Sequence, residues 1–92
     1  MHTIINVGND FSRYLGGGLI SDGNNSGQMF RQKYLLPSLQ KYDTVIIELD
    51  GVIGYPPSFL REAFRELPNA NAIVLITHDD QLQSEIQMYM RG

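Results

Sequence analysis

The chain has 92 residues, a length typical of a single domain and too short for two. A hydrophobic content of 42% and a charged content of 18% are those of a folded globular protein, which excludes a disordered chain. The net charge of −3 and the scattered Lys and Arg residues argue against a nucleic-acid-binding face. The absence of cysteine excludes disulfides and thiolate metal sites.

Two short strands are expected near the start of the chain. Residues 3–7 form a β-prone run that is closed by a Gly-Asn-Asp turn signal, and residues 19–21 form a second, shorter run. Three consecutive glycines, residues 16–18, lie between them. Because glycine tolerates backbone conformations and close approaches that other residues do not, this segment predicts a bend or a bulge beside the second strand.

A first helix is expected over residues 27–40, with apolar side chains along one broad face. Asn25 and Gln28 are spaced as in a capping box, and Ser26 is an alternative N-cap. Pro37 lies inside the run and removes one backbone N–H group. We therefore expect Pro37 to kink the helix or to end its regular part.

Strands and helices alternate in the second half of the chain. Residues 44–49 and 72–77 are almost entirely apolar, which is typical of strands that are covered on both faces. Residues 58–67 and 79–91 carry apolar side chains at helical spacing. The alternation implies parallel strands with right-handed crossovers. Together these elements predict an α/β fold: one domain over residues 1–92, with a small mixed four-stranded sheet and three helices.

The two apolar strands, and the helix between them, predict the core. We expect most of their apolar side chains to be buried: Val45, Ile46, Ile47, Ile73, Val74, Leu75 and Ile76 on the strands, with Phe59, Ala63 and Phe64 packed against them.

The junction between the strand at 44–49 and the helix that follows is the stretch most informative about function. Pro56 and Pro57 restrict the backbone and should hold Tyr55 outward, which suits a recognition surface. Ser58 should open the helix, either as a plain N-cap or as a phosphoacceptor whose phosphate the helix N-terminus would favour. With Arg61, these residues form the predicted interaction surface; the alternative is a rigid connection without a partner.

A second candidate site involves the glycine segment. Exposed N–H groups of consecutive glycines can cradle a phosphate, although this segment lacks the Gly-Lys-Ser/Thr sequence of a P-loop. A nucleotide or phosphate site here would use Gly17, Gly18, Asp22, Arg31 and Asp50 as ligand contacts. The competing interpretation makes the glycines a bend and pairs Arg31 with Asp22 or Asp50 in a structural ion pair.

No metal site and no cofactor are expected. His78, Asp79 and Asp80 could offer ligands, but adjacent residues rarely converge on one ion, and the chain has no histidine pair at helical spacing. We therefore interpret the two aspartates as favourable charges at the start of the last helix. The two histidines do not assemble into a Ser/His/Asp arrangement for nucleophilic catalysis.

Six blocks of the sequence resemble the STAS-like domain family, a group of small bacterial domains of unknown function. They are residues 11–14 (FSRY), 16–18 (GGG), 21–23 (SDG), 26–31 (SGQMFR), 36–37 (LP) and 50–64 (DGVIGYPPSFLREAF). The chain departs from the family pattern at two places. Gly18 and Leu19 replace an arginine after the glycine pair, and Arg65 replaces a glycine after the Ala-Phe pair of the helix.

The resemblance implies a STAS-like fold and a relation to STAS domains, which include the anti-sigma-factor antagonists. In those proteins a serine that opens the helix after a strand and a loop is phosphorylated by a partner kinase with a histidine-kinase-like ATPase fold. Ser58 occupies that serine position here, whereas Tyr55, Pro56 and Pro57 replace the acidic and serine residues usual before it. The resemblance therefore implies a protein partner, with such an ATPase as the implied class.

We expect a non-enzymatic regulatory or protein-interaction module that acts through the surface at residues 55–58. The alternatives are a nucleotide- or phosphate-binding domain or small enzyme at the glycine segment, and a purely structural subunit of a larger assembly. No apolar run approaches the roughly 20 residues of a membrane span, and the start of the chain is too short and polar for a signal peptide. We therefore expect a cytoplasmic monomer or homodimer that binds neither membrane nor nucleic acid.

Overall fold

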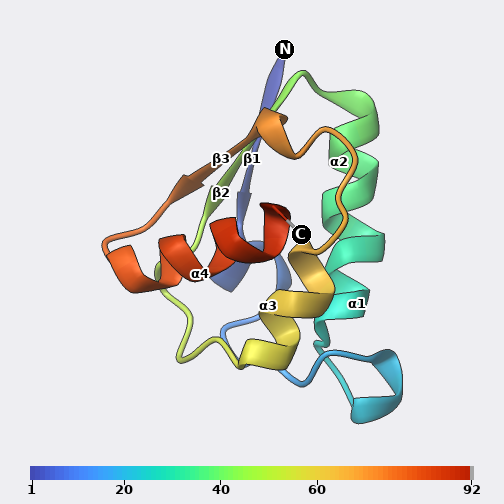
Figure 1. Ribbon diagram of the computed structural model, residues 1–92. Helices are drawn as coiled ribbons and strands as arrows, with labels where there is room; N and C mark the ends of the chain where they lie inside the picture. The colour runs from blue at the N-terminus through green and yellow to red at the C-terminus, as the bar shows by residue number, and fades with distance from the viewer. Residues whose placement is uncertain (92) are drawn as a thin grey trace.

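Three parallel strands form one sheet in the computed structural model, which describes residues 1–91 (Figure 1). The strands are β1 (His2–Asn6), β2 (Thr44–Glu48) and β3 (Ile73–Ile76), and their order across the sheet is β1-β2-β3. Val45 of the central strand pairs with Thr3 and with Ile73, and this register continues along both strand pairs. The predicted α/β class is thereby confirmed.

The strand predicted over residues 19–21 is wrong, and so are the four-stranded and mixed sheet that depended on it. A short 3₁₀ helix, Ile20–Asp22, occupies that position. The Asp22 carboxylate accepts a hydrogen bond from the Leu19 N–H group at 3.0 Å, and the Asp22 N–H group donates to the Leu19 carbonyl oxygen at 2.9 Å. Both backbone groups of Leu19 are thus bonded within the turn rather than in a sheet.

The first predicted helix is present but is not α-helical throughout. It consists of α1 (Gly27–Phe30), a π-helical turn (Arg31–Leu35) and α2 (Leu36–Lys41). The Ser26 hydroxyl caps it by accepting a hydrogen bond from the Met29 N–H group at 3.1 Å, so the alternative cap is the one used. The wider π turn lies directly before Pro37, where a regular turn would press the proline ring against the carbonyl four residues earlier.

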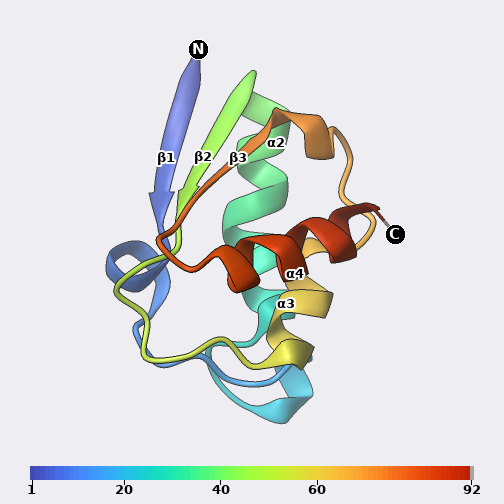
Figure 2. The same ribbon diagram turned by 60° about the vertical axis from the view of Figure 1, so that its left-hand side comes forward.

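The α-helices of the described chain all lie on one face of the sheet (Figures 1 and 2). The remaining two are α3 (Pro57–Phe64), which packs against α1, and α4 (Asp80–Arg91), which packs against α3. Both crossovers advance in the same direction, from β1 to β2 and from β2 to β3. Right-handed crossovers of this kind place every connecting helix on one side, and covering the other side needs a reversal of strand order.

The core therefore lies between one sheet face and the helices. The predicted burial of Phe59, Ala63 and Phe64 is confirmed, and Val45 and Ile47 of β2 are also fully buried. The predicted covering of both sheet faces is wrong. On the open face Val74 and Ile76 are 45% and 47% exposed, and Ile46 is only half-buried, as are Ile73 and Leu75 on the other face.

Gly27 brings α1 and α3 into direct backbone contact. A Cβ atom added at Gly27 would lie 2.2 Å from the carbonyl oxygen of Phe59, far inside the sum of the atomic radii.

The α3 helix ends at Phe64 rather than at Leu67, where the sequence predicted its end. Among residues 1–91, no helix is both long enough and apolar enough to cross a membrane.

Candidate functional site

Loops that follow different strands meet at the carboxyl edge of the sheet. The Ile53 N–H group, in the loop after β2, donates a hydrogen bond of 3.0 Å to the carbonyl oxygen of Arg13, in the segment after β1. The same two segments approach each other at Gly8, where an added Cβ atom would lie 3.0 Å from the Gly51 carbonyl oxygen. Because α/β sheets commonly bind ligands outside the carboxyl ends of their strands, this edge is the first place to seek a site.

An apolar surface covers the contact between these two segments. Tyr14 and Ile53 are its exposed large side chains, with 71% and 69% of their surfaces open to solvent. Six residues line a shallow hollow of about 400 Å³ here, and we call them the carboxyl-end surface: Tyr14, Leu15, Ile53, Gly54, Tyr55 and Pro56. Exposed apolar side chains that gather in one place are typical of interaction sites.

Tyr55 anchors the loop after β2 instead of facing outward. Its hydroxyl donates a hydrogen bond of 2.6 Å to the Leu49 carbonyl oxygen, directly after β2. Its ring packs edge-on against Phe59, with 6.3 Å between the ring centroids. Burial raises the pKa of the Tyr55 phenol above its usual range. The prediction that Tyr55 is largely exposed is therefore wrong, because the residue is half-buried and packs against the core.

Ser58 lies inside the first turn of α3 and does not cap it. The helix begins at Pro57, a residue favoured at the first helical position, and Pro56 is the capping residue. No side-chain hydrogen bond caps this helix, so the predicted capping role of Ser58 is wrong. Ser58 is half-buried, whereas Pro57 and Arg61 are exposed on the outer side of α3.

Tyr14 and Ile53, the exposed large side chains of the carboxyl-end surface, were not among the predicted site residues. One signal for Ile53 is present: the pair Val52-Ile53 lies between Gly51 and Gly54, in a turn where polar residues are usual. An apolar pair in such a turn must serve the core or a partner. Val52 packs against the core, and Ile53 points to solvent.

A polar cluster joins the loops after β2 and β3. The Asp50 carboxylate accepts hydrogen bonds from the Thr77 hydroxyl at 2.8 Å and from the His78 N–H group at 3.2 Å, and lies 2.5 Å from the His78 ring atom Nδ1. Hydrogen bonds from the His78 and Thr77 side chains hold the pKa of Asp50 below its usual value. The cluster borders a hollow of about 330 Å³ beside the start of α4, and it fastens the two loops together.

The aspartates that follow His78 serve the start of α4. The Asp79 carboxylate caps the helix by accepting a hydrogen bond from the Leu82 N–H group at 3.0 Å. Asp80 is the first helical residue, where its negative charge faces the positive end of the helix dipole. Within residues 1–91, no three His, Cys, Asp or Glu side chains are arranged to hold a metal ion.

The glycine segment serves the start of α1. The carbonyl oxygens of Gly17 and Gly18 accept hydrogen bonds from the N–H groups of Gly27 at 3.0 Å and Gln28 at 2.8 Å. The Ser26 hydroxyl accepts a hydrogen bond from the next N–H group, that of Met29. Together these three bonds occupy the N–H groups at the start of α1 that a phosphate would need. The segment therefore supplies acceptors to the chain itself, and the bulge predicted beside a second strand is wrong, because that strand is absent.

The other members of the predicted ligand set lie elsewhere. The Arg31 guanidinium donates hydrogen bonds to two backbone carbonyls just beyond the end of α3, so its predicted ion pair with Asp22 or Asp50 is wrong. Gly18 contacts the first turn of α3, at the other end of that helix from the carbonyls that bind Arg31. The two ends are about 10 Å apart along the helix axis. Asp22 closes its own turn, and Asp50 belongs to the polar cluster. Gly17 lies against the Asp22 side chain, but Arg31 and Asp50 lie elsewhere, so the structure does not bring the whole set together.

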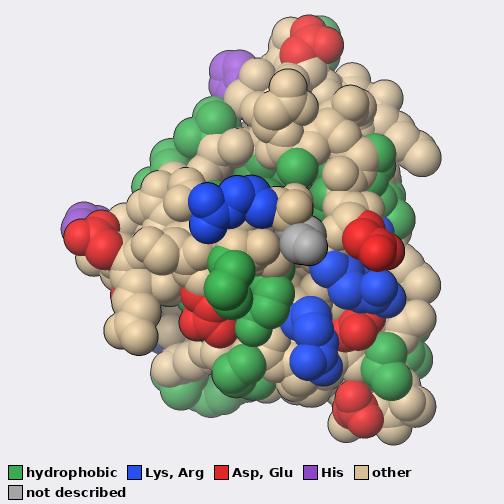
Figure 3. Space-filling model, viewed as in Figure 1, with side chains coloured by type: hydrophobic (Ala, Val, Ile, Leu, Met, Phe, Trp, Pro, Cys, Tyr) green, Lys and Arg blue, Asp and Glu red, His purple; other side chains and the backbone are tan. Residues whose placement is uncertain are grey.

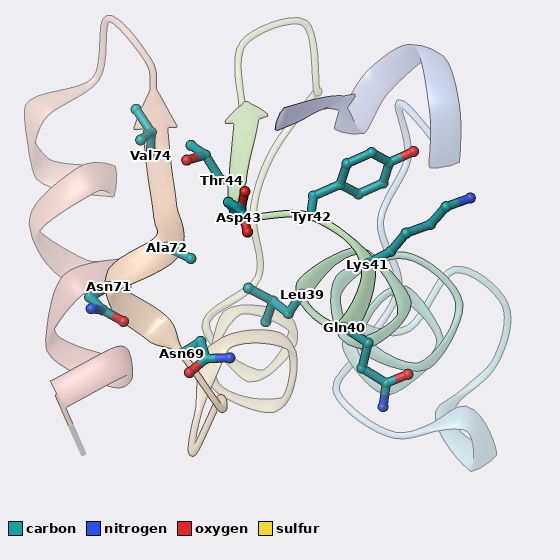
Figure 4. A pocket seen from close by; sticks show the side chains of 10 residues that line it. All are labelled: Leu39, Gln40, Lys41, Tyr42, Asp43, Thr44, Asn69, Asn71, Ala72 and Val74. Atoms are coloured by element: carbon teal, nitrogen blue, oxygen red, sulfur yellow. The ribbon is translucent and has the colours of Figure 1, made fainter. Parts of the chain in front are cut away.

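A larger hollow lies at the opposite, amino edge of the sheet. It measures about 560 Å³ and is bounded by the end of α2, the start of β2 and the turn before β3 (Figure 4). Its polar side chains diverge, because Lys41 and Tyr42 point away from the centre while Asn69 and Asn71 lie on the far wall (Figure 4). Ligand sites need a few polar groups that converge, so we assign no ligand to this hollow.

A protein-family model covers the central part of this chain. The model of the STAS-like domain of unknown function (DUF4325) matches residues 26–77, more than half of the sequence. The matched region extends from the cap of α1 to the residue after β3 and contains the whole of α3 with the loop before it. No curated protein and no solved structure matches the chain. On the family model, the chain belongs to the STAS-like domain family of unknown function.

Proposed function

We propose that this domain is a non-enzymatic regulatory module that binds another protein through the carboxyl-end surface. The observation that carries the proposal is the exposure of Tyr14 and Ile53, two large apolar side chains that line one hollow. A surface with these side chains and without converging polar groups suits protein recognition better than substrate chemistry. The alternative of a nucleotide or phosphate enzyme has less support, because Arg31 and Asp50 lie apart from Gly17 and Asp22.

Internal hydrogen bonds hold the carboxyl-end surface in one shape. The Tyr55 hydroxyl ties the loop to the end of β2, and the Ile53 N–H group ties it to the segment after β1. The Asn25 side-chain amide donates to the carbonyl oxygen of Tyr14 and to the hydroxyl of Ser12, each at 3.2 Å. A surface that is already ordered loses less conformational entropy on binding, which favours affinity.

The family relation supports an ATPase with a histidine-kinase-like fold as the partner class, with Ser58 as its phosphoacceptor. Ser58 adjoins the carboxyl-end surface, and its hydroxyl is not engaged in capping α3. A phosphate there would lie in the first turn of α3, close to the positive end of the helix dipole. The exposed Arg61 lies three residues further on, within reach of that phosphate on the helix surface.

Affinity capture from the source cells tests the surface. Ile53→Asp places a charge in its centre and should lower recovery of the partner about tenfold or more, as for a hot-spot residue. Its stability should stay within about 0.5 kcal/mol of wild type, because the side chain is largely exposed. Met88→Asp on α4 is the matched control, since Met88 is also an exposed apolar residue, 53% open to solvent. Equal recovery with all three proteins would contradict the proposal.

The phosphoacceptor step has its own test. Ser58→Asp adds a negative charge in the first turn of α3, where the helix dipole favours it, so the variant should fold normally. If phosphate is the natural signal, Ser58→Asp should change partner recovery severalfold, whereas Ser58→Ala should behave like the unphosphorylated protein. Wild-type recovery with both variants would remove Ser58 from the proposal and leave the carboxyl-end surface untouched.

A further inference from the structure

The sheet face that the helices leave uncovered carries a continuous apolar patch. Strand alternation directs four aliphatic side chains to this face, and we call them the open sheet face: Ile4, Ile46, Val74 and Ile76. The register places Ile4, Ile46 and Val74 in one row across the three strands. Ile4 is 52% exposed, although aliphatic side chains in parallel sheets are normally buried. Figure 3 views the molecule from the side of the helices, so only the edge of this face is visible, as hydrophobic side chains along the upper left.

We propose that the open sheet face binds an amphipathic α-helix of a partner protein, with an apolar stripe flanked by Lys and Arg. The dimensions of the face fit one helix. The outer strands of a three-stranded sheet lie about 10 Å apart, which equals the diameter of a helix with its side chains. Five strand residues extend about 17 Å, the length of about three helical turns. Helices are also the elements that cover both faces of parallel sheets.

The charges around the face specify the flanks of that helix. No strand contains Lys or Arg, and the central strand carries one carboxylate on this face, Glu48; Asp43 lines the hollow at the amino edge and Asp50 belongs to the polar cluster. Lys41 and Asp10, of opposite charge, line a hollow beside Ile4. The amino terminus pairs with Asp43 and His78 with Asp50, but Glu48 forms no ion pair with any described residue. Because Glu48 projects from the same side of β2 as Ile46, a cation beside the apolar stripe would meet it.

A second copy of this chain fits the face less well. Two such faces, stacked as sheets, would meet over a flat area of roughly 200 Å² each. Stable dimers bury about 800 Å² per partner, so this patch alone would not hold two copies together, and a helix that covers the same area would bind weakly and transiently. The stacking would also place a Glu48 side chain from each copy in one interface, which costs energy through like-charge repulsion. A basic helix removes that repulsion.

Two synthetic peptides test the proposal. Both are helical, about 14 residues long and carry the same leucine stripe; one has lysine flanks and the other glutamate flanks. Each is titrated into the full chain with labelled Ile and Val methyl groups. We expect the lysine peptide to shift the methyl signals of the open sheet face and to bind at least tenfold tighter than the glutamate peptide. Val74→Lys should weaken the lysine peptide at least tenfold, while Met88→Lys on α4 should leave its affinity unchanged.

Several results would overturn the proposal. They are shifts confined to other methyl groups, equal affinities for the two peptides, and self-association of the free chain through these same methyl groups. Val74→Thr keeps the shape of valine and serves as a second variant if Val74→Lys does not fold; it should weaken binding severalfold, and wild-type affinity would count against the proposal. The outcome does not depend on the carboxyl-end surface, because that surface lies on the loops at the edge of the sheet, whereas the proposal is judged on the methyl signals of the three strands.

Discussion

At the scale of single residues, the Tyr55 hydroxyl is the bond that fixes the loop after β2. Tyr55→Phe removes its hydrogen bond and leaves the carbonyl of the buried Leu49 unpaired, so the free energy of unfolding should fall by about 1 kcal/mol. Tyr14→Phe is the matched control, because Tyr14 is 71% exposed and should lose nothing measurable. Urea unfolding of the two variants checks this expectation, and equal stabilities would contradict it.

The same side chain predicts a dependence of stability on pH. Burial raises the pKa of Tyr55 in the folded protein, whereas the phenol of an unfolded chain has a pKa of about 10. Below that pH the Tyr55 phenol is neutral in both the folded and the unfolded protein, so its contribution to the free energy of unfolding is complete. Above it, the unfolded chain loses a proton that the folded protein keeps, so the free energy of unfolding falls as pH rises. Unfolding at pH values on either side of 10 should show a smaller fall in Tyr55→Phe than in wild type; parallel curves would refute the assignment.

Gly27 tests the contact between α1 and α3. Gly27→Ala would place a methyl group 2.2 Å from the Phe59 carbonyl oxygen, so the helices must separate and stability should fall by about 1–3 kcal/mol or more. Gly54→Ala is the control, because an added Cβ atom there meets nothing within 4 Å. Thermal unfolding should separate the two variants clearly. A Gly27→Ala protein as stable as wild type would show that the contact is not tight.

The sequence identified the residues of this loop but not their directions. Tyr55 points inward because the carbonyl of Leu49, which only the fold places beside it, accepts its hydroxyl. The position of the Leu49 carbonyl beside Tyr55 depends on the tertiary fold, so two prolines in the sequence cannot predict it. The start of α3 could have been placed better, since proline is favoured at the first helical position and Pro57 therefore competes with Ser58 for the boundary.

At the scale of elements, the sheet has one buried face and one open face. Phe64→Ala on α3 should cost about 3–5 kcal/mol, because Phe64 is buried against the covered face. Val74→Thr should change stability by about 0.5 kcal/mol at most, because Val74 belongs to the open sheet face and threonine keeps its shape. Urea unfolding of both variants compares the faces directly. A large loss in Val74→Thr would indicate that both faces are covered.

Helices and strands were largely predictable because their side-chain periods are local. The three main strands and the helical segments lie close to their predicted positions. The covering of the sheet was not predictable from the apolar runs, because a strand buried on both faces and a strand with one open apolar face have the same composition. Strand order decides between them, and it follows from crossovers that all advance in one direction.

At the scale of the whole molecule, two apolar surfaces remain open to solvent. The carboxyl-end surface lies on the loops after β1 and β2, and the open sheet face lies across the three strands. The sequence predicts the first surface only in part: Tyr55 and Pro56 were predicted site residues, whereas Tyr14 and Ile53 were not. The open sheet face was not predictable in this way, because the strands were expected to be covered on both faces and to leave no apolar side chains exposed. A domain with two open apolar surfaces is suited to contact more than one protein element.

Site-specific photo-crosslinking tests the central claim most directly. A photoreactive benzoyl-phenylalanine replaces Ile53 in the full chain in its source cells, and the matched control carries it at Met88 on α4. Both positions are exposed, so neither replacement should unfold the domain. We predict a covalent adduct of one discrete mass, containing a second protein, at position 53 and not at 88, and loss of most of it when Tyr14→Asp is added. No protein adduct at position 53, or the same adducts at both positions, would contradict the account of the carboxyl-end surface.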